Sequence, residues 1–138
     1  MKSKEKDNIG VVIRKMTIVD YDSLIALWKE GNIPCRPRGR DSKKNIRLQL
    51  QQPTSFYFVA EDKGKIVGAI LGTHDGRKGW INRLIITSSY RQKGIAKRLI
   101  EEVELCLEAI GINIVACLIE DWNTASMQVL TIRLHKTY

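Results

Sequence analysis

The stretch that decides the fold is "INRLIITSSYRQKGIAKRLIEEVE", residues 81–104. Its first part is apolar and rich in isoleucine, which is typical of a strand, and its last part has the apolar period of a helix that buries one face. A short basic turn that contains Gly94 joins the two. The first N–H groups of a helix have no partner within the helix and carry partial positive charge. This strand, turn and helix therefore predict a site for an anion.

The helix that follows Gly94 has the strongest periodic pattern in the chain. Its apolar stripe consists of Ile95, Leu99, Val103, Cys106 and Ile110. The next run, residues 112–119, is apolar on both faces, which is typical of a strand that helices cover on both sides. A helix between a strand at 79–87 and a strand at 112–119 predicts that the two strands pair in parallel through a right-handed crossover.

The other elements follow from the same periodicities and their breaks. Strands are expected over residues 11–16, 55–62, 65–75 and 79–88, and helices over residues 20–32 and 43–52. Residues 33–42 contain two prolines and a glycine and predict an irregular loop. The expected fold class is α/β with the order β-α-α-β-β-β-α-β-α: a mixed sheet with helices on both faces and an atypical or shortened carboxyl-terminal end. Residues 1–8 are expected to be a disordered tail and residues 9–138 a single domain.

Length and composition set the broad class. A chain of 138 residues suits one domain with a core of its own. There is no apolar run of about eighteen residues and no signal-peptide pattern, so a cytoplasmic protein without membrane contact is expected. The cysteines, Cys35, Cys106 and Cys117, match no metal-binding spacing. They are expected to be buried free thiols, and no metal site is expected.

The formal net charge of +8 leaves several partners open. Basic residues gather in "KSKEK", "RPRGRDSKK", "GRKG" and "RQKGIAKR". Such clusters suit a nucleic acid, an acidic acceptor or a phosphorylated cofactor, and equally a solvated surface. The chain lacks the interleaved aromatic residues and the helix-turn-helix pattern of nucleic-acid-binding proteins, so a nucleic acid is the least favoured of these partners.

The hexapeptide "RQKGIA", residues 91–96, resembles the [RQ]-x-x-G-x-[GA] signature of the Gcn5-related N-acetyltransferases, the GNAT family. Residues 81–104 are similar to that family's motif throughout. The expected order of elements resembles the family's fold from residue 11 to about residue 125, most closely in small single-domain bacterial and archaeal members. The resemblance implies an enzyme that moves an acetyl group from acetyl-CoA to an amine of a protein, a peptide or a small molecule. The family's usual route is direct attack in a ternary complex.

The resemblance also implies which residues hold acetyl-CoA. The strand residues Leu84, Ile85 and Ile86 would offer main-chain groups to the pantetheine arm, and an N–H group near Ile86 would stabilise the oxyanion. The pyrophosphate would lie on the main-chain N–H groups of Arg91, Gln92, Lys93, Gly94, Ile95 and Ala96, with Lys97 near the phosphates. Asn123 matches a family asparagine that bonds the pantetheine arm. It also suits the N-cap of a following helix, and the two roles are compatible.

Two departures from the family pattern concern catalysis. Leu130 occupies the position of the tyrosine that acts as general acid in many members, and Asn82 and Arg83 lie where some relatives carry a catalytic glutamate. The remaining candidates for acid and base are Glu120, Asp121, His74, Asp75 and Tyr138, each of which also suits a solvated surface. The alternative function is therefore a regulatory module that binds acetyl-CoA with weak or no catalysis.

The carboxyl-terminal residues predict that a second subunit packs against the chain. Leu130, Ile132 and Leu134 alternate with polar residues, which predicts a strand that pairs with another subunit. Alternatively, the chain is shortened and a partner covers the open edge of the sheet. Both interpretations predict a homo-oligomer.

The loop at residues 33–42 lies where family members shape the acceptor pocket. It carries Arg36, Arg38 and Arg40. Because guanidinium groups bind carboxylates well, these residues suggest an acceptor that is acidic or bears a carboxylate. The alternative is that they only keep the loop soluble.

Overall fold

The computed structural model describes residues 10–121 and 126–133, with side chains as far as residue 116. The elements run in the order β1 (Val11–Lys15), η2 (Ile18–Asp20), α1 (Tyr21–Glu30), α2 (Lys43–Leu50), β2 (Ser55–Asp62), β3 (Lys65–His74), β4 (Gly79–Ile86), η3 (Ser88–Tyr90), α3 (Ile95–Ala109), β5 (Ile114–Asp121) and β6 (Ser126–Arg133). The elements η2 and η3 are single turns of 3-10 helix.

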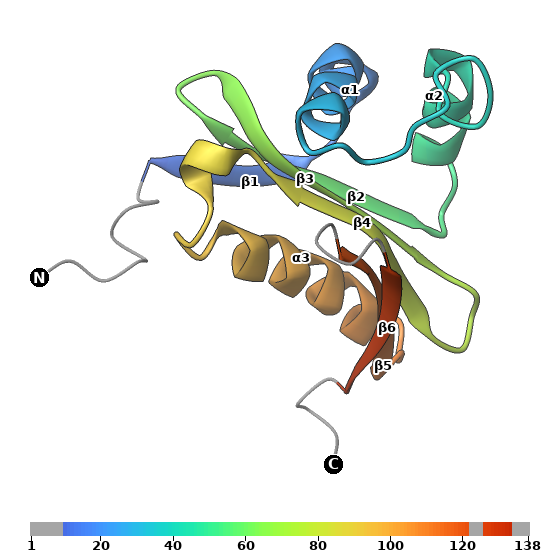
Figure 1. Cartoon of the computed structure of the whole chain (residues 1–138). Helices are drawn as coiled ribbons and strands as arrows, with labels where there is room; N and C mark the ends of the chain where they lie inside the picture. The colour runs from blue at the N-terminus through green and yellow to red at the C-terminus, as the bar shows by residue number, and fades with distance from the viewer. Residues whose placement is uncertain (1–9, 122–125, 134–138) are drawn as a thin grey trace, which may run out of the picture.

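The strands form one six-stranded sheet in the order β1-β2-β3-β4-β5-β6, so neighbours in the sequence are neighbours in the sheet. β4 and β5 are parallel, and the other described pairs are antiparallel. α3 connects the parallel pair, as predicted, because parallel strands need a long crossover connection. Figure 1 shows α1 and α2 over one face of the sheet and α3 along the other.

Each face of the sheet has an apolar core. On one face α3 buries Ile95, Leu99, Val103 and Leu107. On the other face, Leu24 and Trp28 of α1 and Ile46 of α2 are fully buried against β2 and β3. The predicted stripe of α3 is confirmed for its first three members. Its last member, Ile110, follows the end of the helix and is 51% exposed, so Leu107 ends the buried stripe instead.

Glycines in β3 and β4 let α3 lie close to the sheet. A Cβ atom at Gly79 would lie 2.4 Å from Leu107 Cδ1, and one at Gly72 would lie 2.9 Å from Val103 Cγ1. A side chain at either position would push α3 off the sheet, because closely packed interiors leave no spare volume. These contacts set the position of α3 and hence of the turn that precedes it.

The fold class predicted from the sequence, a mixed α/β sheet with helices on both faces, is confirmed. The prediction of a helix after residue 123 is wrong. Residues Ser126–Arg133 form β6, which pairs with β5 of the same chain rather than with a second subunit. The alternation of apolar and polar residues in this segment has the period of two that a strand requires. The tail expected at residues 1–8 lies outside the described residues.

Cys35 and Cys106 are free thiols, as predicted, but both are half-buried rather than buried. Burial raises the pKa of Cys106. The side chain of Cys117 lies outside the described ones. Within residues 10–121 and 126–133, the structure has no helix that is both long and apolar enough to span a bilayer.

Candidate functional site

The sheet opens between β4 and β5. The two strands pair only over residues 79–81, which lie opposite residues 115–117. Beyond this point β4 continues to pair with β3 as far as Ile86, whereas its pairing with β5 stops. The far half of β4 therefore presents one edge that no neighbouring strand occupies within the described residues.

A bulge in β4 lies where the two strands part. Leu71 of β3 lies opposite Arg83, and the next residue, Gly72, lies opposite Ile81, so Asn82 is an extra residue in β4. The side-chain amide of Asn82 donates to Thr73 Oγ1 at 2.9 Å. A bulge bends its strand and increases the local twist, so this one turns the end of β4 away from β5.

Main-chain groups of Leu84 and Ile86 face the opening. The N–H group of Thr87 donates to the carbonyl of Val67 at 2.9 Å. In an antiparallel pair, residues alternate between bonding to the neighbouring strand and pointing away from it. The main-chain groups of Arg83, Ile85 and Thr87 therefore bond to β3. Those of Leu84 and Ile86 point away from β3. The carbonyl of Ile86 accepts a hydrogen bond from Arg91 Nε at 3.1 Å.

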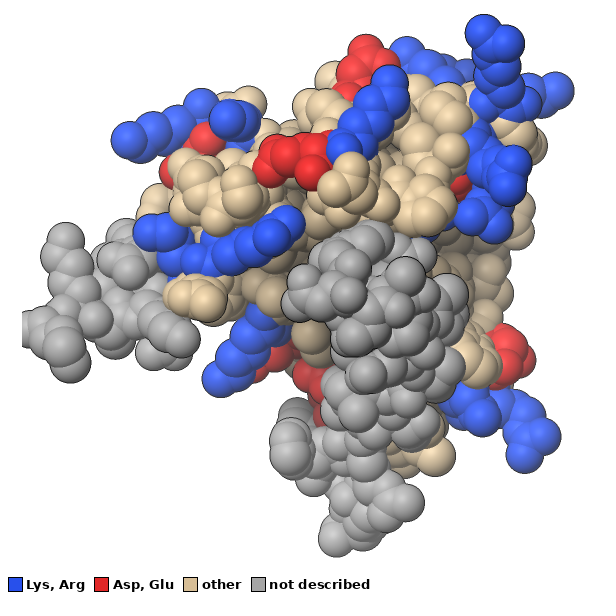
Figure 2. Space-filling model, viewed as in Figure 1, with Lys and Arg blue, Asp and Glu red and all other residues tan. Residues whose placement is uncertain are grey.

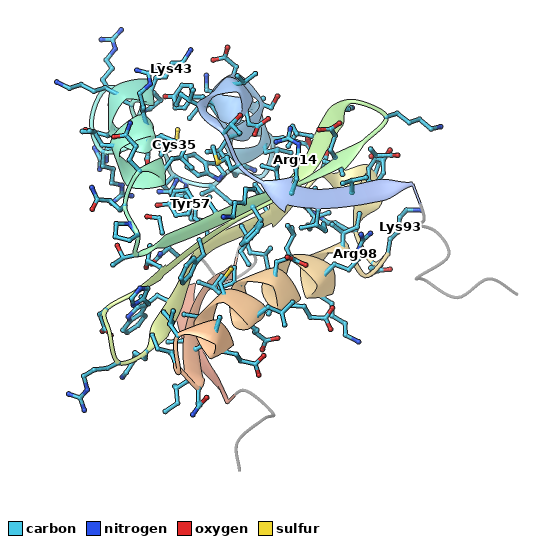
Figure 3. The ribbon with its side chains drawn as sticks, turned by 180° about the vertical axis from the view of Figure 1, so that it is seen from behind. Arg14, Cys35, Lys43, Tyr57, Lys93 and Arg98 are labelled. Carbon is cyan, nitrogen blue, oxygen red and sulfur yellow. The ribbon has the colours of Figure 1, made fainter. Side chains whose placement is uncertain are left out.

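The turn before α3 presents its main chain at the surface. Gly94 is the N-cap of α3 and has a φ of 82°, and Gln92 has a φ of 62°. A left-handed residue followed by a helical one directs successive N–H groups to one concave side, which suits an anion. No side chain caps the helix. Lys97 is exposed on the first turn of α3, and Figure 3 shows Lys93 and Arg98 at this end of the helix.

Two carboxylates hold the turn in position. Glu30, the last residue of α1, accepts hydrogen bonds from Thr87 Oγ1 at 2.7 and 2.9 Å and from the N–H group of Ser88 at 3.2 Å. These bonds, that of Thr87 first, lower the pKa of Glu30. Asp62 of β2 accepts a hydrogen bond from the hydroxyl of Tyr90, which raises the pKa of that tyrosine. Hydrogen bonds thus attach the segment around η3 to α1 and to β2.

A cleft of about 930 Å³ runs from the end of β4 to α2. Toward α3 its lining includes Leu84, Ile85, Ile86, Arg91 and Ala96. Toward α2 its lining includes Arg40, Asp41, Gln49, Tyr57 and Arg83. The cleft therefore connects five residues predicted to hold acetyl-CoA with the loop predicted to meet the acceptor.

Asp41 organises that loop. The residue is 5% exposed, and its Oδ2 accepts a hydrogen bond from the N–H group of Arg36 at 2.7 Å. Its carbonyl accepts one from the hydroxyl of Tyr21, also at 2.7 Å. The loop is irregular, as predicted, and is tied to α1. Of the three arginines predicted to meet an acceptor, Arg40 lines the cleft, and Arg36 and Arg38 do not.

Basic side chains also gather around the loop, and of these Arg40 alone lines the cleft. Figure 2 shows them over α2 and the loop before it. The exposed members are Arg36, Arg38, Arg40, Lys43, Lys44 and Arg47. The face of the molecule beside the loop is therefore positively charged.

Arg83 received no role from the sequence, yet it lines the cleft with a side chain that is 15% exposed. Its Cζ lies 4.2 Å from the centre of the Trp28 ring, and its Nη2 lies 3.6 Å from Asp41 Oδ2. One signal could have identified it: Arg83 is the one charged residue of β4 and directly precedes the apolar run of residues 84–86. Charged residues at such positions are rare unless they are paired or functional.

Tyr57, Leu71 and Arg83 lie opposite one another on three neighbouring strands. The hydroxyl of Tyr57 donates to Gln49 Oε1 at 2.8 Å, and burial raises the pKa of this tyrosine. Tyr57 therefore keeps its proton near neutral pH and acts in the cleft as a hydrogen-bond donor rather than a base. The sequence analysis missed this residue because nothing local distinguishes it from a core tyrosine.

Two predicted catalytic candidates hold a turn outside the cleft lining. His74 stacks on Phe56 with ring centres 5.5 Å apart, and its Nδ1 accepts a hydrogen bond from the N–H group of Gly76 at 3.0 Å. Asp75 accepts bonds from the N–H groups of Lys78 and Arg77, both at 2.9 Å, which lower its pKa to about 2. These contacts give both side chains a structural role in the β3–β4 turn.

The other candidates lie where the structure gives no side chains. Glu120 and Asp121 end β5, and Leu130 lies opposite Cys117 in the β5–β6 pair. Asn123 and Tyr138 lie outside the described residues. Within the described part of the chain, no group of three or more His, Cys, Asp and Glu side chains could hold a metal ion.

Known proteins resemble this chain in sequence and in fold. An acetyltransferase of Pectobacterium atrosepticum is 31% identical over 106 residues, which cover 77% of this chain and 74% of that protein. An acetyltransferase of Sodalis glossinidius is 35% identical over 92 residues, which cover 67% of this chain and 63% of that protein. The fold is similar to that of the PaiA N-acetyltransferase from Thermoplasma acidophilum in complex with coenzyme A. The TM-score is 0.72 at 21% identity, over 84% of this chain and 83% of that one.

The family model described as the acetyltransferase (GNAT) family matches residues 22–135. The matched region contains the opening between β4 and β5, the turn before α3 and the whole cleft. The chain belongs to the GNAT family of acetyltransferases.

Proposed function

We propose that this chain transfers an acetyl group from acetyl-CoA to an amine by direct attack in a ternary complex. The observation that carries the proposal is the single cleft that starts at the opening between β4 and β5 and ends at the loop 33–42. A thioester can enter such a cleft from one side and an amine from the other. The two reactants then meet without a covalent enzyme intermediate.

The described main chain suits acetyl-CoA. The main-chain groups of Leu84 and the N–H group of Ile86, which face the opening, can bond the amides of an extended pantetheine arm, much as a neighbouring strand would. The N–H groups of residues 92–96 and the uncapped end of α3 can hold the pyrophosphate, with Lys97 nearby, whereas the N–H group of Arg91 donates to the carbonyl of Ser88. The pantetheine and the pyrophosphate would thus be bound mainly by backbone, which places few demands on side-chain identity.

The proposed reaction needs a hydrogen-bond donor for the developing oxyanion and a group that takes the proton from the amine. Acetyl-CoA supplies an activated acetyl group as a thioester. The N–H group of Ile86 would stabilise the developing charge on the carbonyl oxygen, and the bond from Arg91 to the Ile86 carbonyl holds the next peptide, between Ile86 and Thr87, in place. Among the described residues that line the cleft, Asp41 is the one carboxylate, and it is engaged by Arg36. Within the described residues, water in the cleft would therefore take the proton of the amine, and coenzyme A would leave as a thiolate that takes up a proton from water.

The second candidate is a regulatory module that binds acetyl-CoA and turns it over weakly or not at all. It is favoured by Leu130, an apolar residue at the position of the family's usual acid. One of two measurements separates the candidates. Acetyl-CoA should raise the melting temperature under both. Thiol release with a panel of amines should occur under the first only.

Gly94→Leu should abolish the rise in melting temperature with acetyl-CoA. A leucine here would add a side chain within the turn that is proposed to hold the pyrophosphate, and a φ of 82° disfavours any residue with a Cβ atom by about 1–2 kcal/mol. The matched control is Gly64→Leu in the β2–β3 turn, which has a φ of 79° and nothing within 4 Å of an added Cβ. It carries the same backbone strain away from the cleft and should keep the full rise. A normal rise in Gly94→Leu would refute the assignment of the pyrophosphate site.

The proposal also includes a homo-oligomer and a cytoplasmic location. β6 lies at the end of the sheet, and its outer edge has no partner within the described residues. Exposed strand edges recruit further strands, so a second copy of the chain is a suitable neighbour. Sedimentation as a monomer over a wide concentration range would contradict this part.

A further inference from the structure

The guanidinium of Arg83 has more donors than partners. It carries five N–H donors, and it makes no hydrogen bond with the described part of the chain. Its contact with Asp41 Oδ2, at 3.6 Å, is too long for a hydrogen bond, and its Nη1 is buried without a hydrogen-bond partner. Buried charged groups are normally both paired and hydrogen-bonded, because desolvation otherwise destabilises the fold. Arg83 therefore has donors available for an external acceptor.

Neighbouring residues fix the orientation of Arg83. Its guanidinium lies over the indole of Trp28, which is itself fully buried. Its backbone follows the bulge at Asn82 and pairs with Leu71. A planar guanidinium held on an aromatic ring loses little further freedom when it binds a carboxylate through two parallel hydrogen bonds. The side chain is thus preorganised for an anion.

The charges around Arg83 favour an anion with one negative charge. Arg40 Nε also lies 3.6 Å from Asp41 Oδ2, so two guanidinium groups share one carboxylate. The cluster of Arg40, Asp41 and Arg83 has a net charge of +1. A monoanion neutralises this cluster, whereas a dianionic phosphate monoester would leave it with a net charge of −1.

The position of Arg83 connects this anion with the proposed reaction. Arg83 and Ile86 lie on the same strand, three residues apart, which corresponds to about 10 Å of extended chain. Both line the same cleft. An anion at Arg83 would therefore lie within a small molecule's length of a thioester held at Ile86.

We propose that Arg83 binds a carboxylate of the acceptor, which is a small amine that bears this carboxylate a few bonds from the reacting nitrogen, as an amino acid does. This inference rests on the proposed acetyl transfer and names its substrate class. It places recognition of the acceptor on Arg83 and the Trp28 ring beneath it, rather than on the exposed arginines of the loop.

The first experiment measures thiol release with the common L-amino acids and their carboxamides as matched pairs. The wild-type chain should prefer the acid of at least one pair by tenfold or more in kcat/KM. The amine of a carboxamide is less basic and more of it is neutral, so a preference for the acid cannot arise from the amine's own reactivity. Equal use of acid and carboxamide in every reactive pair would overturn the inference.

Variants then test whether Arg83 causes the preference for the acid over its carboxamide. Arg83→Met should raise KM for the preferred acid at least tenfold, leave that for its carboxamide unchanged and leave KM for acetyl-CoA unchanged. Arg83→Lys, which keeps the charge and loses the planar fork, should restore part of the preference. Arg77→Met removes an exposed charge from the β3–β4 turn outside the cleft lining and should behave as wild type. A preference that persists in Arg83→Met would also refute the assignment.

A binding measurement keeps the test independent of turnover. Melting temperatures are compared with saturating coenzyme A plus a panel of N-acetyl amino acids or their carboxamides. At least one acid should stabilise the wild-type chain more than its carboxamide does, and Arg83→Met should remove the difference. If no amine releases thiol, the proposed acetyl transfer fails, and this comparison still decides whether Arg83 binds a carboxylate. An equal effect of acid and carboxamide throughout the panel would reject that binding.

Discussion

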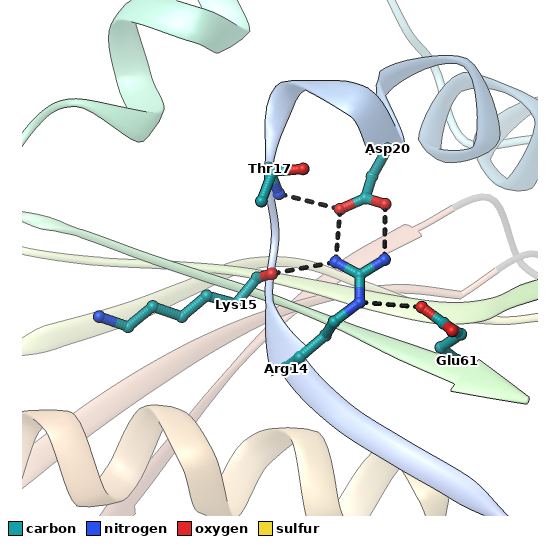
Figure 4. A network of polar contacts seen from close by, with 5 residues as sticks. All are labelled: Arg14, Lys15, Thr17, Asp20 and Glu61. Atoms are coloured by element: carbon teal, nitrogen blue, oxygen red, sulfur yellow. Dashed lines mark hydrogen bonds and ion pairs between the residues drawn. The ribbon is translucent and has the colours of Figure 1, made fainter. Parts of the chain in front are cut away.

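Arg14 and Arg83 both lie next to an aspartate, but within the described residues only the guanidinium of Arg14 makes hydrogen bonds, and it makes four. Figure 4 shows its guanidinium donating to both carboxylate oxygens of Asp20, at 2.8 and 2.9 Å, and to Glu61 at 2.9 Å. The carbonyl of Lys15 accepts a further bond at 3.2 Å. This network joins β1, η2 and β2, and none of its members lines the cleft.

The cleft shows the opposite arrangement. Arg83 is more buried than Arg14, with 15% of its side chain exposed against 36%, yet it makes no hydrogen bond within the described residues. Burial without hydrogen bonds reduces stability, whereas the contacts of Arg14 contribute to it. The difference teaches that an arginine whose donors are mostly used within the fold holds it together, and that one held rigid with unused donors is available for a ligand.

The pKa shifts agree with this reading of the Arg14 network. Burial alone would raise the pKa of Asp20, but the hydrogen bonds from Arg14 and Thr17 outweigh burial and hold it below its ordinary value. The hydrogen bond to Asp20 in turn raises the pKa of Arg14 above its ordinary value. The charged forms of both residues are thus part of the folded state.

The largest expected effect is a loss of stability on breaking the Arg14 network. Arg14→Met leaves the carboxylate of Asp20, 6% exposed, without its guanidinium. We expect the free energy of unfolding to fall by about 2–3 kcal/mol, less than for a fully buried pair because Arg14 is partly exposed. Urea unfolding measures this value, and kcat/KM per folded molecule should not change. A loss below about 0.5 kcal/mol would mean that the network contributes no more than a surface pair.

The next effect is a pH dependence that belongs to the same network. The pKa of Asp20 is lowered in the folded state, so its contribution to stability is complete above the unfolded pKa and is lost as the pH falls through the folded pKa. We expect Asp20→Asn to reduce stability by about 1–2 kcal/mol near neutral pH, with the difference from wild type shrinking below about pH 4. Urea unfolding at a series of pH values checks the trend. A difference that stays constant down to pH 2 would exclude titration of Asp20 as the cause.

The smallest expected effect gives the sharpest contrast between the two arginines. Arg83→Met, the same substitution as at Arg14, removes a guanidinium that lacks hydrogen bonds and leaves an apolar side chain over Trp28. We expect the free energy of unfolding to stay unchanged or to rise by up to about 1 kcal/mol. The measurement is the same urea series, with Arg14→Met as the matched variant. A fall of 2 kcal/mol or more would show that Arg83 has a structural role like that of Arg14.

Much of the acetyl-CoA side of the candidate site could be predicted from local sequence. Gly94 precedes an amphipathic helix, and that helix follows an apolar strand, so the turn, the buried face of α3 and the parallel pairing of β4 with β5 all follow from patterns within about forty residues. The acceptor side could not be predicted in this way. The bulge at Asn82 depends on the register of β4 against β3, which contacts between distant parts of the chain decide.

By itself, then, the sequence determined the order of most elements, the family and the turn before α3, because helix and strand periodicities and a left-handed glycine act between near neighbours in the chain. Only the tertiary structure decided which charged side chains form hydrogen bonds within the fold. Trp28, Asp41 and Arg83 come from α1, a loop and β4, and they meet only when both helices have packed on the sheet. Hydrogen bonding and burial depend on such distant contacts, and for that reason two arginines that look alike in the sequence have different roles in the fold.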